Sequence, residues 1–427
     1  MKVLQIIPGS GGSFYCGNCL RDSKFYSSLK KMEHDVVKIP MYLPLFDDEN
    51  AMKGDVPVFY GAVSMYLKQH YPVFRKFPAW FHKMLDSGPM LRLASQFAGS
   101  TRAEGLEDMT VSMLLGEDGN QNEELEHMAQ WIENHFKPDV IHISNALLLG
   151  LVHRLKKIPG TKIVCSLQDE DVWVETMHEA YREKSWKLMG EKAKEVDLFI
   201  SVSDYFAKYS IDKMGLDSEK VKTIPLGVDP DDYRFLDAAQ KPRNIGFISR
   251  QCHGNGLDIL VDAFVLLKQK PEFDDVKLII TGGYTGDDKK FRRAQKKKIS
   301  KHNLSESIEF QADFDGDDRL DFFDKISVMS VPVRGGEAFG IYITEAMASA
   351  IPVVQPAVGA FTEIVEKSGA GLLYEPNTPE ILAEQLENVL SQKKMLSDLS
   401  KSARKASVNI YNINKLAKDM IDTYKQL

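Results

Sequence analysis

The stretch from Val331 to Pro356, VPVRGGEAFGIYITEAMASAIPVVQP, contains two short apolar runs separated by a glycine pair and a helical pattern. A buried strand is expected to lead into Gly335 and Gly336. A helix is then expected to begin near Gly340, before the next strand at Pro352–Val354. This order of strand, loop, helix and strand is typical of a parallel sheet that is covered by helices.

The same alternation of short apolar runs and longer helical patterns continues along most of the chain. Glycine, proline or aspartate bounds the runs, as expected for buried parallel strands. The pattern therefore predicts an α/β protein with doubly wound, Rossmann-like sheets. The predicted strands are Val3–Ile7, Val36–Ile39, Val140–Ile143, Lys162–Leu167, Leu198–Val202, Val221–Ile224, Asn244–Ile248, Val276–Thr281, Ser307–Phe310, Ser327–Val331, Pro352–Val354 and Gly371–Leu373.

The alternation is interrupted between Pro225 and Pro242, where several turn-forming residues and a charged, weakly periodic tail occur together. This interruption predicts a linker between two domains. We expect a first domain over residues 1–235 and a second over residues 236–409. A final helix over residues 410–427 has one apolar face, and either domain could cover it, including the first.

Composition excludes several classes of protein. The formal net charge of −7 argues against a general nucleic-acid binder. No apolar stretch approaches the roughly 20 residues that a membrane-spanning helix needs. Four cysteines in 427 residues are too few for a disulfide scaffold. We therefore expect a cytoplasmic protein, with peripheral contact at the inner face of the membrane left open.

Two glutamates flank the helix start near Gly340: Glu337 precedes it and Glu345 follows within its first turns. The backbone N–H groups of Phe339, Gly340 and Ile341 would face an anion there, because a helix N-terminus favours negative charge. Carboxylates on both sides of such a site suit a ligand with hydroxyls at its ends and phosphates between them, as in a nucleotide sugar. The simpler alternative is that both glutamates only cap the helix.

This segment resembles the E-x7-E motif of the family 4 glycosyltransferases, which are retaining enzymes with a GT-B fold. The resemblance implies two Rossmann-like domains that face each other across a cleft. It covers almost all of the second domain and matches residues 1–235 more loosely. Four further segments carry it: SVSDYFAKYSIDKMGLDSEKVKTIPLGVDPDDY, IGFISRQCHGNGLDILVDAF, ADFDGDDRLDFFDKISVMSVPV and PAVGAFTEIVEKSGAGLLYEP.

The resemblance assigns a role to each residue around the motif. It implies that Glu337 binds hydroxyls of the transferred sugar and that Glu345 binds the ribose of the nucleotide. It further implies that Phe339, Gly340 and Ile341 present backbone N–H groups to the donor. The implied donor is a nucleotide-diphosphate sugar.

The resemblance also implies that Arg250 neutralises the diphosphate as it leaves, where electrostatic stabilisation contributes most. Gly11 and Gly12 would close over the diphosphate from the first domain. The family usually has a lysine a few residues after the arginine, but Asn255 stands at that position here. His253 could supply part of the missing charge if it is protonated, although a solvated loop histidine is the simpler interpretation.

The acceptor side departs from the family at the strand Lys162–Leu167. The family often has a histidine after this strand, and here Gln168 and Asp169 stand there. Glutamine donates hydrogen bonds but is neither an acid nor a base at neutral pH. A retaining enzyme in which the leaving phosphate takes the acceptor proton would tolerate this change.

Three other features have competing interpretations. Cys16 and Cys19 form a C-x-x-C that fits a redox pair or half of a metal site, and Cys165 and Cys252 fall near predicted ligand loops. Unrelated buried thiols are the simpler alternative. The basic and aromatic insert Phe59–Arg102 fits an anionic membrane, a lipid-linked acceptor or ordinary packing. The basic run Lys289–Lys301 is most simply a solvated helix face.

These observations predict a retaining glycosyltransferase with a glycan, lipid-linked or small-molecule acceptor and with no required metal or cofactor. A glycosyltransferase-like binding protein with weakened or lost activity is the main alternative, because the usual lysine and histidine are missing. A nucleotide-sugar epimerase or a phosphorylase on the same fold, and a thiol redox or metal-binding protein, are further alternatives.

Overall fold

A computed structural model describes residues 1–8, 15, 17–41, 59–60, 103 and 105–427. The chain forms two compact units, and each draws on separate parts of the sequence. The first contains Met1–Gly12, Asn18–Ile224 and Ala417–Leu427, whereas the second contains Ser13–Gly17 and Pro225–Leu416. The division at Pro225 falls at the start of the predicted linker, before the expected boundary at residue 236.

The sheet of the first unit has six parallel strands in the order β2-β1-β3-β4-β5-β6. Successive strands are added first on one side of β1 (β2) and then on the other (β3 to β6), so the connecting helices lie on both faces of the sheet. The strands are β1 (Lys2–Ile7), β2 (Asp35–Pro40), β3 (Val140–Ile143), β4 (Lys162–Leu167), β5 (Leu198–Ser201) and β6 (Val221–Thr223).

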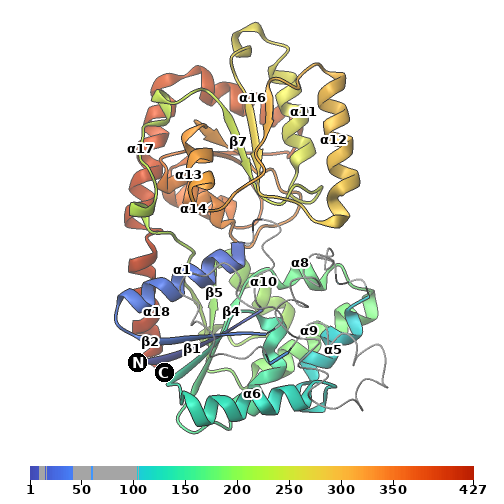
Figure 1. Cartoon of the computed structure of the whole chain (residues 1–427), viewed down its shortest axis with the longest axis vertical. Coiled ribbons are helices and arrows are strands. Elements are labelled where there is room, and N and C mark those ends of the chain that lie inside the picture. The colour runs from blue at the N-terminus through green and yellow to red at the C-terminus, as the bar shows by residue number, and fades with distance from the viewer. Residues whose placement is uncertain (9–14, 16, 42–58, 61–102, 104) are drawn as a thin grey trace. The chain divides into compact units, whose positions relative to one another are not determined.

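The helices of the first unit lie against this sheet (Figure 1). They contribute buried apolar residues to its core. A side-chain cap fixes the start of one of them: the Ser203 hydroxyl accepts a hydrogen bond from the Phe206 N–H at 3.0 Å. The helices described here are α1 (Gly17–Lys31), α5 (Glu107–Leu115), α6 (Asn122–His135), α7 (Val152–Leu155), α8 (Glu170–Val174), α9 (Glu179–Ala193) and α10 (Asp204–Met214).

The sheet of the second unit also has six parallel strands, in the order β12-β11-β10-β7-β8-β9. The strands are β7 (Ile245–Ile248), β8 (Leu278–Thr281), β9 (Ile308–Phe310), β10 (Val328–Met329), β11 (Val353–Pro356) and β12 (Gly371–Tyr374). The helices are α11 (Leu257–Leu267), α12 (Lys289–Lys301), α13 (Gly316–Asp324), α14 (Ile341–Ala348), α15 (Phe361–Ser368), α16 (Pro379–Ser391) and α17 (Lys393–Asn409).

Every strand predicted from the sequence is present, and the predicted parallel, doubly wound topology is confirmed in both units. The differences are confined to the strand ends. The strand predicted from Val276 begins at Leu278, because its ladder with β7 starts where Leu278 pairs with Ile245. No helix in the described part of the chain is both long and apolar enough to cross a membrane.

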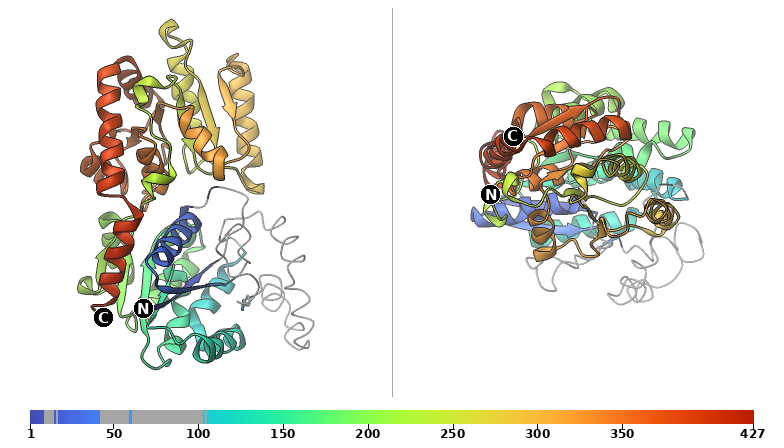
Figure 2. Two further views of the ribbon diagram at one scale, coloured as in Figure 1. Left: turned by 60° about the vertical axis from the view of Figure 1, so that its left-hand side comes forward. Right: turned by 90° about the horizontal axis from the view of Figure 1, so that it is seen from above.

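The last helix, α18 (Ile413–Tyr424), has the amphipathic spacing expected from the sequence. Its residues from Ala417 onwards belong to the first unit, where Met420, Ile421 and Tyr424 are buried. Both ends of the chain therefore lie in the first unit, close to one another (Figures 1 and 2).

Candidate functional site

The loop between β10 and α14 holds Glu337 in a partly exposed position. The Tyr342 hydroxyl lies 3.4 Å from Glu337 Oε2, and the Ala360 N–H donates to the Glu337 carbonyl at 2.9 Å. Gly359 has φ +55°, and a Cβ there would lie 2.4 Å from the Glu337 nitrogen. Glycine is therefore required at 359 for the two loops to approach each other around Glu337.

The N-terminus of α14 offers donors for an anion. Gly340 takes a left-handed conformation, with φ +79°, and the helix begins directly after it. Among the described residues, none accepts a hydrogen bond from the backbone N–H groups of Phe339, Gly340 or Ile341. These three residues are buried, so the unused donors and the helix dipole favour a negatively charged ligand beside Glu337.

Glu345 lies inside the second unit with no exposed surface. Tyr233 donates its hydroxyl to Glu345 Oε1 at 2.6 Å, and Tyr15 donates its hydroxyl to Oε2. The guanidinium of Arg319 lies 3.3 Å from Oε1 and supplies the opposite charge. Both carboxylate oxygens therefore already have protein partners, which differ from the ribose hydroxyls implied by the resemblance.

The electrostatics around Glu345 favour this arrangement. Burial and the neighbouring Glu345 charge raise the pKa values of Tyr15 and Tyr233 well above their ordinary value, so both hydroxyls remain protonated donors. Burial opposes the charge of Arg319, but Glu345 and Tyr233 nevertheless raise its pKa. The ribose contact that the resemblance implies would therefore have to replace the Tyr15 hydroxyl at Glu345 Oε2 or share the oxygen with it.

The loop after β7 contains Arg250, which has a carboxylate partner. Its Nε donates to Asp288 Oδ2 at 2.8 Å and its Nη2 to Oδ1 at 3.0 Å. Burial would raise the pKa of Asp288, but Arg250 and Thr285 hold it below the ordinary range. Asn255, in place of the family lysine, donates to Ser249 Oγ at 2.7 Å and to the Arg250 carbonyl at 3.1 Å, and so braces the loop.

A second cation at this loop, Arg334, did not stand out in the sequence. It forms a bidentate pair with Asp258 at 2.8 Å through both Nη atoms, and it also donates to the His253 carbonyl. Its own N–H donates to the Gly254 carbonyl at 2.9 Å. Its position in the sequence, between a buried strand and Gly335, could have marked it as a residue of a ligand-facing loop. His253 itself is exposed and lies 3.9 Å from Asp258.

In the first unit, Gln168 and Asp169 follow β4 as predicted. The Gln168 side chain is buried and donates to the Ser144 carbonyl at 2.6 Å, while its Oε1 has no partner among the described residues. Asp169 has a left-handed backbone, with φ +55°. Burial raises its pKa, although a hydrogen bond from Asn18 and the charge of Arg21 act in the opposite direction.

Two neighbouring carboxyls were missed by the sequence analysis. Burial raises the pKa of Glu170 to about 8, although the N–H groups of Ala146 and Gln168 both donate to it at 2.8 Å. Burial and the charge of Asp169 raise the pKa of Asp171 to about 7. Glu170 and Asp171, at the start of α8 after this loop, therefore have pKa values that burial raises towards neutral pH.

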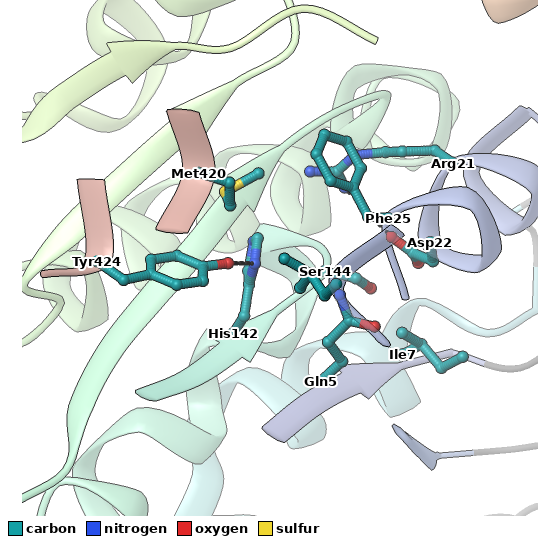
Figure 3. A pocket seen from close by; sticks show the side chains of 10 residues that line it. Gln5, Ile7, Arg21, Asp22, Phe25, His142, Ser144, Met420 and Tyr424 are labelled. Atoms are coloured by element: carbon teal, nitrogen blue, oxygen red, sulfur yellow. Dashed lines mark hydrogen bonds and ion pairs between the residues drawn. The ribbon is translucent and has the colours of Figure 1, made fainter. Parts of the chain in front are cut away.

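A buried polar network lies on one face of the first sheet (Figure 3). Nδ1 of His142 on β3 lies 2.5 Å from the Tyr424 hydroxyl on α18, and its Nε2 lies 2.6 Å from Ser166 Oγ. Arg21 on α1 donates to the same Ser166 oxygen. The adjoining small cavity is lined by three side-chain atoms without a partner among the described residues: Gln5 Oε1, Arg21 Nε and Ser144 Oγ.

The network has a predicted pH dependence, because burial and the charge of Arg21 lower the pKa of His142 from 6.5 to about 3. The folded state therefore resists protonation that the unfolded state accepts below pH 6.5. Stability is expected to be complete above that pH and to fall by about 1.4 kcal/mol per pH unit as the pH decreases towards 3.

The measurement is the free energy of unfolding at several pH values for the wild type and for His142→Gln. The free energy of unfolding of the wild type, minus that of the variant, should fall only below pH 6.5. The carboxyls are common to both proteins, and their contributions cancel in this difference. The exposed His153→Gln variant is the matched control and should follow the wild type. A difference that does not change with pH would contradict a neutral, buried His142.

Some sequence predictions concern residues outside the described part of the chain. Gly11, Gly12 and Cys16 are among them, as is the insert Phe59–Arg102 apart from Phe59 and Tyr60. The described cysteines, Cys19, Cys165 and Cys252, form no disulfide. Within the described residues, no group of three or more His, Cys, Asp or Glu residues could hold a metal ion.

Comparison with solved structures identifies the class of protein. HepE from Anabaena in complex with UDP aligns over 100% of both chains with a TM-score of 0.70 and 18% sequence identity. Sucrose-phosphate synthase from Thermosynechococcus elongatus aligns over 100% of this chain and 99% of its own, with a TM-score of 0.72 and 17% identity. Together with the two parallel sheets, these similarities define a GT-B fold.

Family models then identify the particular family. The model for glycosyl transferases group 1 matches residues 230–406, and the model for glycosyltransferase family 4 matches residues 119–232. The chain belongs to the family 4 glycosyltransferases.

Curated relatives match about half of the chain. Phosphatidyl-myo-inositol mannosyltransferase from Mycobacterium tuberculosis is 26% identical over 234 residues, which are 53% of this chain and 58% of that protein. D-inositol 3-phosphate glycosyltransferase from Corynebacterium urealyticum is 21% identical over 240 residues, 56% of each chain. The chain thus spans only a little over half the length of these relatives.

Proposed function

We propose that this protein transfers a glycosyl group, with retention of configuration, from a nucleotide-diphosphate sugar to a glycan, lipid-linked or small-molecule acceptor. The observation that supports this most directly is the N-terminus of α14, where three backbone N–H groups without an acceptor in the described part of the chain lie beside Glu337. Such a site complements a diphosphate, and the adjacent carboxylate accepts hydrogen bonds from sugar hydroxyls.

The donor would be held by residues of the second unit. Glu337 would bind hydroxyls of the transferred sugar, and the N–H groups of Phe339, Gly340 and Ile341 would bind the diphosphate. Arg250 would stabilise the leaving phosphate by turning part of its guanidinium from Asp288 to the new charge. In this proposal these protein groups would supply the neutralisation, and the reaction would require neither a metal ion nor a cofactor.

Glu345 would have two functions in this proposal. It organises the interior of the second unit through Tyr15, Tyr233 and Arg319, and it offers Oε2 to the ribose when the donor replaces the Tyr15 hydroxyl. A tyrosine hydroxyl and a ribose hydroxyl make comparable hydrogen bonds to a carboxylate. The exchange therefore involves no loss of a charged pair, because Arg319 remains in place.

The acceptor would lie near the loop after β4, where Gln168 and Asp169 stand. The Gln168 amide is committed to the Ser144 carbonyl and has no acid–base function, so the leaving phosphate would take the acceptor proton. The relatives named as phosphatidyl-myo-inositol and inositol phosphate transferases favour an acceptor with a polyol or phosphate group. Asp169 would accept a hydrogen bond from one of the hydroxyls of this acceptor.

The experiment that tests the donor assignment is a thermal-shift comparison of UDP-, GDP- and ADP-sugars. A donor that binds only the native state raises the unfolding temperature, and at 100 times its dissociation constant it adds about 2.7 kcal/mol of stability. HepE was solved with UDP and with UDP-glucose, so a UDP-sugar is expected to give the largest shift. The absence of a shift with every nucleotide sugar would contradict the proposed function.

A second candidate function is a nucleotide-sugar-binding protein with weakened catalysis. The ion pair between Arg250 and Asp288 favours it, as does the neutral Asn255 at the position of the family lysine. The two functions differ in nucleotide release. A protein that binds a UDP-sugar in the thermal-shift experiment but never releases UDP, with any acceptor or with water, would have this second function.

A further inference from the structure

Helix α12, Lys289–Lys301, carries a strong and unbalanced charge. Its sequence, KKFRRAQKKKISK, contains eight lysines and arginines and no acidic residue. The chain as a whole has a formal net charge of −7. The positive charge is therefore concentrated on one element of an acidic protein. In the second unit, α12 lies beside α11 and forms an outer edge (Figure 1).

Three of the eight cations fasten the helix to its own unit. Lys298 forms an ion pair with Asp262 at 2.7 Å. Arg292 donates to Gln251 at 2.7 Å and lies over the Tyr284 ring, whereas Lys296 lies 5.0 Å from the centre of a phenylalanine ring. These contacts account for the attachment of α12, together with its buried side chains.

The remaining five cations point away from the unit. They are exposed, and within the described residues they make no ion pair or hydrogen bond. At 100° per residue they fall within an arc of about 120°, opposite the buried Gln295 and Ile299, along about 18 Å of helix. This set is called the outer face of α12: Lys289, Lys290, Arg293, Lys297 and Lys301.

Five like charges on one arc repel each other, and no acidic neighbour on the same helix relieves that repulsion. Helices normally alternate charges to avoid this cost. An extended anionic surface would relieve it, and the attraction of several lysines to such a surface accumulates residue by residue. The straight, convex shape of a single helix fits a flat surface better than a groove-bound strand.

We propose that the outer face of α12 docks the second unit on an anionic lipid surface. A nucleic acid is the less suitable partner, because the arc has no aromatic residue on which bases could stack. Attachment of α12 to a membrane surface would not depend on the proposed glycosyl transfer.

The test is co-sedimentation of the purified chain with vesicles of phosphatidylcholine alone or mixed with phosphatidylglycerol. The wild type is expected to bind the anionic vesicles, to release them at about 1 M salt and to ignore pure phosphatidylcholine. The triple variant Lys290→Gln, Arg293→Gln, Lys297→Gln should lose binding by about tenfold or more. Glutamine keeps the helix propensity close to that of lysine and arginine.

The matched control removes the same charge elsewhere in the second unit: Lys394→Gln, Lys401→Gln, Lys405→Gln on the exposed side of α17. It should bind as the wild type does. If the α12 triple variant loses its fold by circular dichroism, the double variant Lys289→Gln, Lys301→Gln at the helix ends replaces it. The proposal would be overturned if the wild type did not bind the anionic vesicles or bound RNA more tightly than vesicles. It would also be overturned if either α12 variant kept full binding, or if the control lost binding to the same extent.

Discussion

Replacement of Glu337 by Gln is expected to abolish glycosyl transfer, with a fall in turnover of at least about 10²–10³-fold. The substitution preserves the size of the side chain but removes the charge that, in the proposed function, would accept hydrogen bonds from sugar hydroxyls beside the N-terminus of α14. Because Glu337 is partly exposed and its carbonyl rather than its carboxylate holds Ala360, the fold should survive. The measurement is release of nucleotide and product from the donor found by thermal shift.

The matched control for this experiment is Glu366→Gln. Glu366 is exposed on α15, close in sequence to the loop that contacts Glu337, and it should retain full turnover. Donor binding by Glu337→Gln should persist, because in the proposed function backbone N–H groups would hold most of the diphosphate. Turnover close to the wild-type value in Glu337→Gln would disprove the proposed catalytic site.

Replacement of Arg319 by Met is expected to destabilise the second unit by about 3–5 kcal/mol. Glu345 has no exposed surface, and Arg319 provides the opposite charge at 3.3 Å. Removal of one partner from a buried pair leaves the other charge without compensation. Among the described residues, the Tyr15 and Tyr233 hydroxyls would be the remaining hydrogen-bond donors to Glu345. The free energy of unfolding in denaturant, measured at neutral pH, gives the effect.

Arg234→Met is the control for the loss of an arginine that pairs with acids. Arg234 contacts Asp321 and Asp324 at 2.7 Å, but its side chain is 52% exposed. Exposed ion pairs contribute little to stability, so this variant should unfold almost as the wild type does. The double variant Arg319→Met, Glu345→Met should recover much of the lost stability, since it leaves no charge buried. Equal effects of Arg319→Met and Arg234→Met would contradict the buried-pair interpretation.

The predicted strands and their order of alternation were accessible from the sequence because the inner strands of the two parallel sheets are buried on both faces. A run such as Val140–Ile143 must then be apolar or nearly so, and this local property is visible without any tertiary information. The position of Glu337 and Gly340 at a strand–helix junction was accessible for the same reason. The glycine has to be there because the backbone is left-handed.

The surroundings of Glu345 could not be predicted, because they depend on contacts between distant parts of the chain. Tyr15 is 330 residues away and Tyr233 is 112 residues away, and a lone tyrosine carries no signal of its partner. The same applies to His142 and Tyr424, which are 282 residues apart. Arg250 stood out in the sequence as a cation in the loop after the strand Asn244–Ile248, but its pairing with Asp288 depends on a capping turn in another segment.

Tyr15 lies near the start of the chain but belongs to the second unit, so each unit is built from segments that are far apart in the sequence. A fragment that begins at the linker and contains Pro225–Leu416 would lack this tyrosine, and Glu345 would lose one of its donors. The first unit likewise needs the residues from Ala417 onwards, which supply the Tyr424 hydroxyl to His142. A chimera that exchanges one unit with a relative therefore has to exchange two separate segments of sequence, and a single junction at Pro225 would leave both interiors incomplete.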